Sequence, residues 1–155
     1  MSRFEETSLF FLRLALGWVL LYAGWEKVIT PGWSAAGYLN SAKTFHAFYA
    51  WLANSGMIQT VNFITEWGLV ILGLALIFGI AVKLAGILGA ILMLLFYFPV
   101  LNGVYPDANS YIVDVHIVYA FALLLIASLG AGKMWQLESW FKKAFPKGAK
   151  FLWIK

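Results

Sequence analysis

The chain has 155 residues, of which 63% are apolar and 12% charged, and its mean hydropathy is +0.82. Soluble domains are about half apolar and about one quarter charged, so this composition excludes an ordinary soluble fold and favours a membrane protein. The net charge of +4 does not indicate nucleic-acid binding, because most basic residues lie in the C-terminal tail. The absence of cysteine excludes disulfides, thiolate metal sites, iron–sulfur ligation and cysteine nucleophiles.

Four long apolar runs follow one another along the chain, at about residues 8–29, 58–79, 84–101 and 111–129. Each is close to the roughly 20 residues that a helix needs to cross a hydrocarbon layer about 30 Å thick. Helices are expected because a spanning segment must satisfy its own backbone hydrogen bonds. We therefore predict an all-α integral membrane protein, with a four-transmembrane-helix bundle formed by residues 1–132.

The loop between the first two runs, residues 30–57, is long enough to hold structure of its own. Phe45, Phe48, Tyr49 and Leu52 follow i, i+3, i+4, i+7 spacing, which predicts a short helix with one apolar stripe. We expect this helix to lie in the membrane interface or to cap the bundle. The second and third runs are separated only by residues 80–83, so they should form an antiparallel hairpin.

Basic residues predict the orientation, since they are enriched in cytoplasmic loops. With both ends inside, only Lys27 and Lys43 lie on the outer side, and the other loop and tail cations lie inside. We therefore expect a multi-pass protein of the cell membrane with cytoplasmic N- and C-termini. The basic, aromatic tail, residues 133–155, either lies against anionic headgroups of the lipid bilayer or is a solvated segment that only sets the topology.

Polar residues inside the spans are informative, because ionisable groups are costly in lipid and tend to face a protein interior. One face of the first span carries five residues at helical spacing: Arg13, Gly17, Leu20, Gly24 and Lys27. The two glycines allow another helix to approach closely. Arg13 either faces that interior or extends to the inner headgroups.

The predicted topology gathers most of the remaining polar residues near the outer leaflet. The candidate polar site consists of Lys27, Glu66, Asp114, His116 and Tyr119. Arg13, Glu26 and Asn62 are candidates for structural or ligand pairing. Lys27 is the expected partner of Glu66, and His116 is the second candidate.

Each of these residues also has a structural interpretation. Glu66 with Lys27 is either an ion pair that fixes helix register or a ligand or proton site. His116 is either a hydrogen-bonded structural residue or a ligand, and Asp114 either caps the fourth helix or takes part in chemistry. No metal, haem or nucleotide motif is present, and bis-histidine haem ligation would need His46, which lies in an expected surface segment.

Three segments resemble the DoxX/DoxD family: RLALGWVLLYAGWEK from Arg13 to Lys27, EWGLVILGLAL from Glu66, and HIVYAFALL from His116. The resemblance covers about residues 10–130. The first loop, which starts Pro31-Gly-Trp33, looks closest to the DoxD branch.

This resemblance implies a four-helix membrane subunit. DoxD is a subunit of thiosulfate:quinone oxidoreductase, which passes electrons from thiosulfate to membrane quinone. The implied function is therefore a quinone-binding redox subunit that works with a redox partner subunit, and the candidate polar site becomes a candidate quinone site. The implied positions to test are Arg13, Lys27, Glu66 and His116. Two alternatives stay open: a non-enzymatic membrane anchor or assembly partner, and a small transporter, which would usually act as a homo-oligomer.

Overall fold

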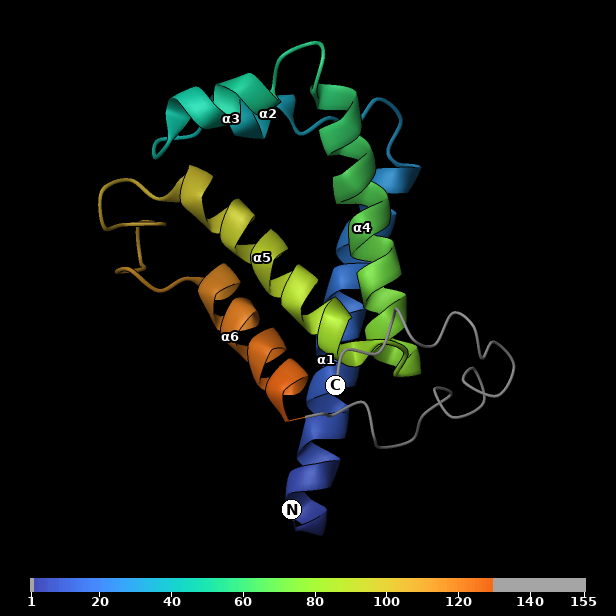
Figure 1. Cartoon of the computed structure of the whole chain (residues 1–155). Helices are drawn as coiled ribbons and strands as arrows, with labels where there is room; N and C mark the ends of the chain where they lie inside the picture. Colours follow the sequence, from blue (N-terminus) through green and yellow to red (C-terminus); the bar gives the residue numbers. More distant parts are fainter. Residues whose placement is uncertain (1, 130–155) are drawn as a thin grey trace.

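The computed structural model describes residues 2–129, and Figure 1 shows that the elements of this part are helices. They are α1 (Arg3–Ile29), α2 (Ala36–Asn40), α3 (His46–Leu52), α4 (Ile58–Phe78), α5 (Val82–Val100) and α6 (Val115–Ser128). The predicted tail, residues 133–155, lies outside the described residues.

Three helices, α1, α4 and α5, are long and apolar enough to cross a membrane. The predicted second and third runs agree with α4 and α5 to within about two residues, whereas α1 begins earlier than expected, after a Ser2 cap. Ser2 and Glu5 bond each other's backbone N–H in a capping box. The sequence of α1 before Ser8 is too polar to be recognised as part of a span.

The fourth predicted run, residues 111–129, is helical only from Val115 to Ser128. Ile112 has φ 58, a left-handed conformation that side chains with a branched β-carbon avoid, so the helix cannot begin at Tyr111. The 14 residues of α6 rise about 21 Å at 1.5 Å per residue, less than the roughly 30 Å of a hydrocarbon layer. The count of four complete crossings therefore stays a prediction.

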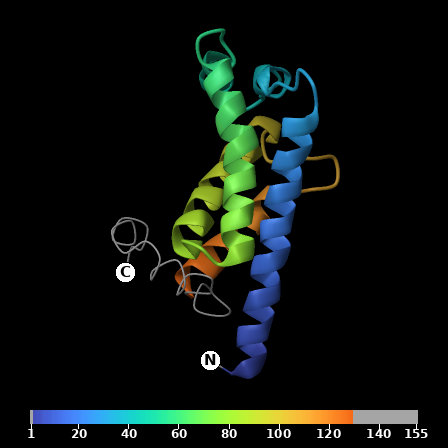
Figure 2. The same ribbon diagram turned by 90° about the vertical axis from the view of Figure 1, so that its right-hand side faces the viewer.

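The long helices run alternately up and down in Figures 1 and 2, so that the N-terminus, the α4–α5 link and the end of α6 lie at the lower end of the view. Helix α1 lies along α4, and α5 lies along α6. Helices α4 and α5 meet at the lower end and diverge upwards, and α2 and α3 lie across the opening. The short α4–α5 link confirms the predicted hairpin.

Glycines allow α1 and α4 to touch backbone to backbone. A Cβ placed on Gly73 would lie 2.5 Å from the backbone nitrogen of Leu21 and 2.7 Å from the carbonyl oxygen of Gly17. A Cβ on Gly24 would lie 2.7 Å from the nitrogen of Val70. The predicted glycine face of the first helix is therefore real. We call this contact the α1–α4 seam.

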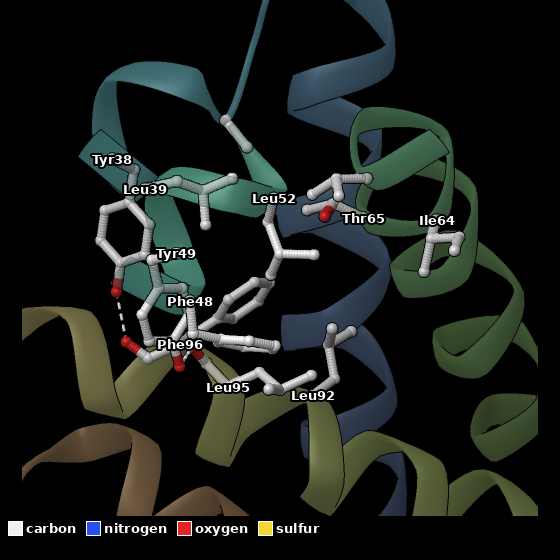
Figure 3. Close-up of a pocket in the computed structure, with 12 residues that line it drawn as sticks. Tyr38, Leu39, Phe48, Tyr49, Leu52, Ile64, Thr65, Leu92, Leu95 and Phe96 are labelled. Carbon is white, nitrogen blue, oxygen red and sulfur yellow. Dashed lines mark hydrogen bonds between the residues drawn. The ribbon is translucent and has the colours of Figure 1, made fainter. Parts of the chain in front are cut away.

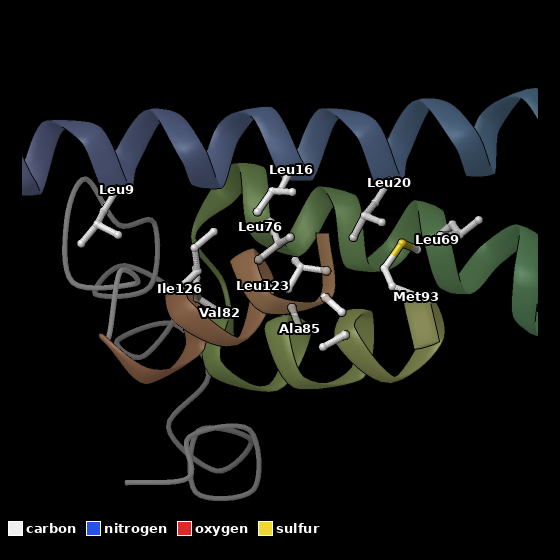
Figure 4. Packing of buried hydrophobic residues seen from close by; sticks show 12 residues of the cluster. Leu9, Leu16, Leu20, Leu69, Leu76, Val82, Ala85, Met93, Leu123 and Ile126 are labelled. Carbon is white, nitrogen blue, oxygen red and sulfur yellow. The ribbon is translucent and has the colours of Figure 1, made fainter. Parts of the chain in front are cut away.

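A cluster of buried apolar side chains joins α1, α4, α5 and α6. Figure 4 shows Leu16 and Leu20 of α1 facing Leu76 of α4 and Leu123 of α6. Gly86 brings α5 equally close to α6, because a Cβ there would lie 2.7 Å from the carbonyl oxygen of Leu123. Packing is thus tightest within each helix pair and at the lower end of the bundle.

The first loop contains two short helices, of which the sequence indicated only α3. Tyr49 of the predicted apolar stripe is buried and Leu52 is half-buried, but Phe48 is exposed. Phe45 precedes α3 in a left-handed conformation, φ 54, so it is not part of the helix. The location of α3 in the membrane interface stays a prediction.

Candidate functional site

A cavity of about 240 Å³ lies where α4 and α5 diverge. It is bounded by α4 and α5 at the sides and by α2, α3 and the residue before α2 above, as Figure 3 shows. Its lining residues are Ala35, Tyr38, Leu39, Phe48, Tyr49, Leu52, Val61, Ile64, Thr65, Leu92, Leu95 and Phe96. The walls are apolar apart from the hydroxyl groups of two tyrosines and one threonine.

Pro99, close to the end of α5, creates the attachment point for the loop above the cavity. Proline has no N–H, so the carbonyl of Leu95, four residues earlier, loses its helical partner. The hydroxyl of Tyr49 donates a hydrogen bond to this Leu95 carbonyl at 3.1 Å. The hydroxyl of Tyr38 donates to the carbonyl of Phe96, as Figure 3 shows.

Two further bonds satisfy carbonyls at the same helix end, where the last turn leaves acceptors without helical partners. The backbone N–H of Lys43 donates to the carbonyl of Pro99 at 3.1 Å. The Thr44 hydroxyl donates to the carbonyl of Leu101 at 2.6 Å. We call residues 35–52, held in this way on α5, the roof of the cavity.

Asn62 attaches the other side of the roof to α4. Its Oδ1 accepts from the backbone N–H of Ala35 at 3.0 Å, and its Nδ2 donates to the Ser34 hydroxyl at 3.3 Å. Asn62 was a candidate for structural or ligand pairing, and the structure places it in a structural contact. The roof is therefore bonded to both helices that it covers.

The three hydroxyls that line the cavity differ in whether they already donate a hydrogen bond within the protein. Burial, with Tyr49 and Asp114 nearby, raises the pKa of Tyr38 to about 12, and burial also raises the pKa of Tyr49. Both phenols therefore stay protonated at neutral pH, and both protons are used on α5. The Thr65 side chain is 95% buried, since its residue is 5% exposed, and within residues 2–129 its hydroxyl makes no hydrogen bond.

Asp114 and His116 form a close pair at the start of α6. Asp114 is the N-cap and accepts from the backbone N–H of His116 and Ile117 at 3.0 and 3.2 Å. Its second oxygen lies 2.5 Å from His116 Nδ1. The capping interpretation of Asp114 is thereby confirmed, and the same carboxylate orients the imidazole.

The histidine ring of this pair stands against one wall of the cavity. The His116 and Phe96 rings meet edge to face with their centroids 6.3 Å apart, and Phe96 lines the cavity. Tyr119, one turn further along α6, is half-buried and packs against the core. Asp114 and His116 are thus the candidate site residues that the structure brings together beside the cavity.

Lys27 and Glu66 do not pair as the sequence suggested. Lys27 Nζ donates to the carbonyl of Ala23 at 2.9 Å and lies 5.5 Å from the centre of the Trp33 ring. No ion pair joins Lys27 to Glu66 within residues 2–129. The expected pairing was wrong because the lysine has a carbonyl in its own helix and a π-face from the first loop as partners.

Glu66 still lies where α4 meets α1, since its carbonyl oxygen is 2.8 Å from a Cβ placed on Gly24. Its side chain is half-buried, whereas Glu26 is exposed on α1. The expected single outer cluster is therefore divided between the top of α1, the α1–α4 seam and the start of α6.

Arg13 is 1% exposed and faces the protein interior instead of extending to headgroups. Its Nη1 lies 3.0 Å from a Cβ placed on Gly79, the left-handed C-cap of α4, and its guanidinium carbon lies 5.2 Å from the centre of the Phe10 ring. A cation at a helix C-terminus is favourable, because that end carries partial negative charge.

Sequence reasoning missed the cavity and its residues Tyr38 and Thr65. The local signal was Pro99, which implies an unbonded carbonyl at Leu95 and hence a donor from elsewhere. Which donor would supply it could not be predicted, because Tyr49 lies 46 residues earlier in the chain.

The family of the chain follows from its similarity to known proteins. No curated protein and no solved structure matches the chain. The DoxX family model matches residues 8–102, which is more than half of the chain. With its long apolar helices, the chain is therefore a multi-pass membrane protein that belongs to the DoxX family.

Proposed function

We propose that this protein is the membrane subunit of a quinone-linked oxidoreductase, of the thiosulfate:quinone type suggested by its DoxD-like first loop, and that the cavity beneath the roof binds the quinone ring. The observation that carries the proposal is an apolar cavity between α4 and α5, two helices that are long enough to cross a membrane. A quinone ring needs an apolar slot with a small number of hydrogen-bonding groups.

The Asp114–His116 pair is the proposed proton-exchanging group. Reducing a quinone to a quinol takes up two electrons and two protons, and the electrons would come from a partner redox subunit. The 2.5 Å contact with Asp114 orients His116 through Nδ1, and the ring stands behind Phe96. A histidine can exchange protons near neutral pH.

The proposed orientation places this site in the outer leaflet. Arg3 and Lys83 lie at the end of the molecule that holds the N-terminus and the α4–α5 link, whereas Lys27 and Lys43 lie at the roof end. By the positive-inside rule we assign the first end to the cytoplasm of the cell, and we propose that both termini are cytoplasmic. Lys27, at the roof end, would then attract an anionic sulfur substrate.

The test is quinone binding by the full chain in lipid nanodiscs, measured as saturable quenching of tryptophan fluorescence by an isoprenoid benzoquinone. Val61→Phe with Leu92→Phe fills part of the cavity, because both side chains line it. Val118→Phe with Leu88→Phe is the matched control on exposed positions. We expect the first pair to weaken binding at least about tenfold, about 1.4 kcal/mol, and the control pair to leave it unchanged.

Absence of a saturable component with the wild-type protein, relative to empty nanodiscs, would reject the quinone proposal. The non-enzymatic alternative, an anchor or assembly partner, would then be favoured. In that case the cavity-filling pair should raise thermal stability by better packing and change no ligand response.

A further inference from the structure

The rim of the cavity includes side chains that are exposed on the outer surface of the helix bundle. Phe48, Ile64 and Leu95 line the cavity, yet they are 48%, 55% and 40% exposed. They come from α3, α4 and α5 respectively. The opening therefore lies in the gap between α4 and α5, below α3.

This opening lies within the apolar stretches of α4 and α5 and not at the helix ends. Ile64 is six residues inside α4, and Leu95 is five residues before the end of α5. At 1.5 Å per residue these positions lie about 8 to 9 Å below the helix ends. With α4 and α5 crossing the membrane, a ligand that passes between Ile64 and Leu95 would come from the acyl chains of the bilayer.

Thr65 is the hydroxyl inside the cavity that remains available to such a ligand. Figure 3 shows it on the α4 side, opposite Tyr38 and Tyr49, whose protons are used on α5 carbonyls. A threonine in a helix often bonds the carbonyl four residues earlier, but within the described residues Thr65 makes no such bond. The hydroxyl oxygen is not fully enclosed by protein atoms but borders the cavity, so a ligand atom there can form a hydrogen bond with it.

The volume limits what can enter. About 240 Å³ is below the roughly 300–1,000 Å³ of sites that enclose a complete drug-sized ligand, so the cavity suits one compact ring but no long tail. We infer that the site takes a membrane-dissolved amphiphile whose ring enters between α4 and α5, whose ring oxygen bonds the Thr65 hydroxyl, and whose apolar tail remains in the bilayer between Ile64 and Leu95. This inference rests on the proposed quinone function and makes Thr65 its specificity-determining residue.

The hydrogen bond from Thr65 to the ligand is tested by titrating the same nanodiscs with an isoprenoid benzoquinone. Wild type is compared with Thr65→Val, Thr65→Ser and Thr60→Val. Valine keeps the shape of Thr65 without its hydroxyl, serine keeps the hydroxyl, and Thr60 is an exposed threonine of the same helix. Loss of one hydrogen bond should raise the Kd roughly three- to tenfold in Thr65→Val. The serine variant and the Thr60 control should bind like wild type.

The entrance is tested with single cysteines, which can be modified selectively because the chain has none of its own. Ile64→Cys and Ile71→Cys are both exposed positions on the same face of α4, two turns apart, and only the first lines the cavity. Each is modified with phenylmaleimide in detergent before reconstitution. Modified Ile64→Cys should lose saturable binding, whereas modified Ile71→Cys should keep it.

The outcomes separate the two proposals. If wild type binds and Thr65→Val binds equally well, Thr65 does not bond the ligand, and the inference fails while the quinone function stands. If modified Ile64→Cys still binds, the entrance between α4 and α5 is wrong. If wild type shows no saturable binding, the proposed function fails and this inference fails with it.

Discussion

The α1–α4 seam and the gap between α4 and α5 are built from the same apolar helix, α4, yet one is closed and the other holds a cavity. On the closed side Gly17, Gly24 and Gly73 bring two backbones into contact. On the other side α4 presents Val61, Ile64 and Thr65 towards α5, and the roof fills the space above. Lipid is as apolar as leucine, so hydrophobicity does not drive two membrane helices together. Small residues decide where their backbones come into contact.

The difference separates a fixed contact from an adaptable one. Opening the seam would remove the backbone contacts that Gly17 and Gly24 of α1 make with α4, whereas in our proposal a ligand enters the α4–α5 gap without moving either helix from its pair. Variants at the seam and on the cavity side should therefore differ in how much they lower the free energy of unfolding.

The largest effect is expected at the centre of the seam. Gly73→Ala introduces a Cβ 2.5 Å from the Leu21 nitrogen, so α1 must shift, which should cost about 1–3 kcal/mol of stability. The free energy of unfolding is measured by circular dichroism in mixed micelles with increasing dodecyl sulfate.

Gly68→Ala is the matched control on the same helix, because its Cβ would meet no atom closer than 3.9 Å. It should be neutral or slightly stabilising, since alanine favours helix over glycine. Equal destabilisation by the two variants would show that close approach at the seam is not what stabilises α1 against α4.

A smaller effect is expected at the start of α6, on the side of the cavity. Asp114→Ala removes the acceptor for two backbone N–H groups and should cost about 1 kcal/mol in the same unfolding measurement. Asp114→Asn keeps an oxygen for the cap and should cost much less. If asparagine is as harmful as alanine, the charge facing His116, and not the cap, is the stabilising feature.

The smallest effect is expected in the roof. Tyr38→Phe removes one of the hydrogen bonds to α5 and should cost roughly 0.5–1 kcal/mol near neutral pH. The raised pKa makes the stability contribution of Tyr38 depend on pH. Tyr38 has a folded-state pKa of about 12 against an ordinary value of 10.0. Its contribution is therefore complete below pH 10 and is lost as the pH rises towards 12.

Tyrosinate absorbance measures this directly in an alkaline titration. Wild type should show a late-titrating component that is smaller in Tyr38→Phe, where only Tyr49, whose pKa burial also raises, still contributes to it. The stability difference between the two proteins should shrink across that pH range. An exposed tyrosine in the loop between α5 and α6, Tyr111, provides the control Tyr111→Phe, which should leave the late component in place. A late component of undiminished size in Tyr38→Phe would contradict the raised pKa of Tyr38.

Length and apolarity were sufficient to predict α1, α4 and α5, because the constraint that a membrane places on a span acts locally on the sequence. The start of α6 was placed too early, since Tyr111, Ile112 and Val113 are as apolar as a helix and only Asp114 shows where the cap lies. At the site, the Asp114 cap was foreseen from adjacent residues. The Lys27 contacts and the roof were not, because Trp33 and the α5 carbonyls are brought there by the tertiary fold.

The attachment of the roof to α5 also has a consequence for biosynthesis. Its acceptors are the carbonyls of Leu95, Phe96, Pro99 and Leu101, whereas its donors lie between Tyr38 and Tyr49. A ribosome makes the chain from the N-terminus, so it completes these side-chain donors 46 to 58 residues before their acceptors. The first loop can bond Asn62 of α4 earlier, but its bonds to α5 form only once α5 is made and in place. Completing the roof is therefore a late step of assembly.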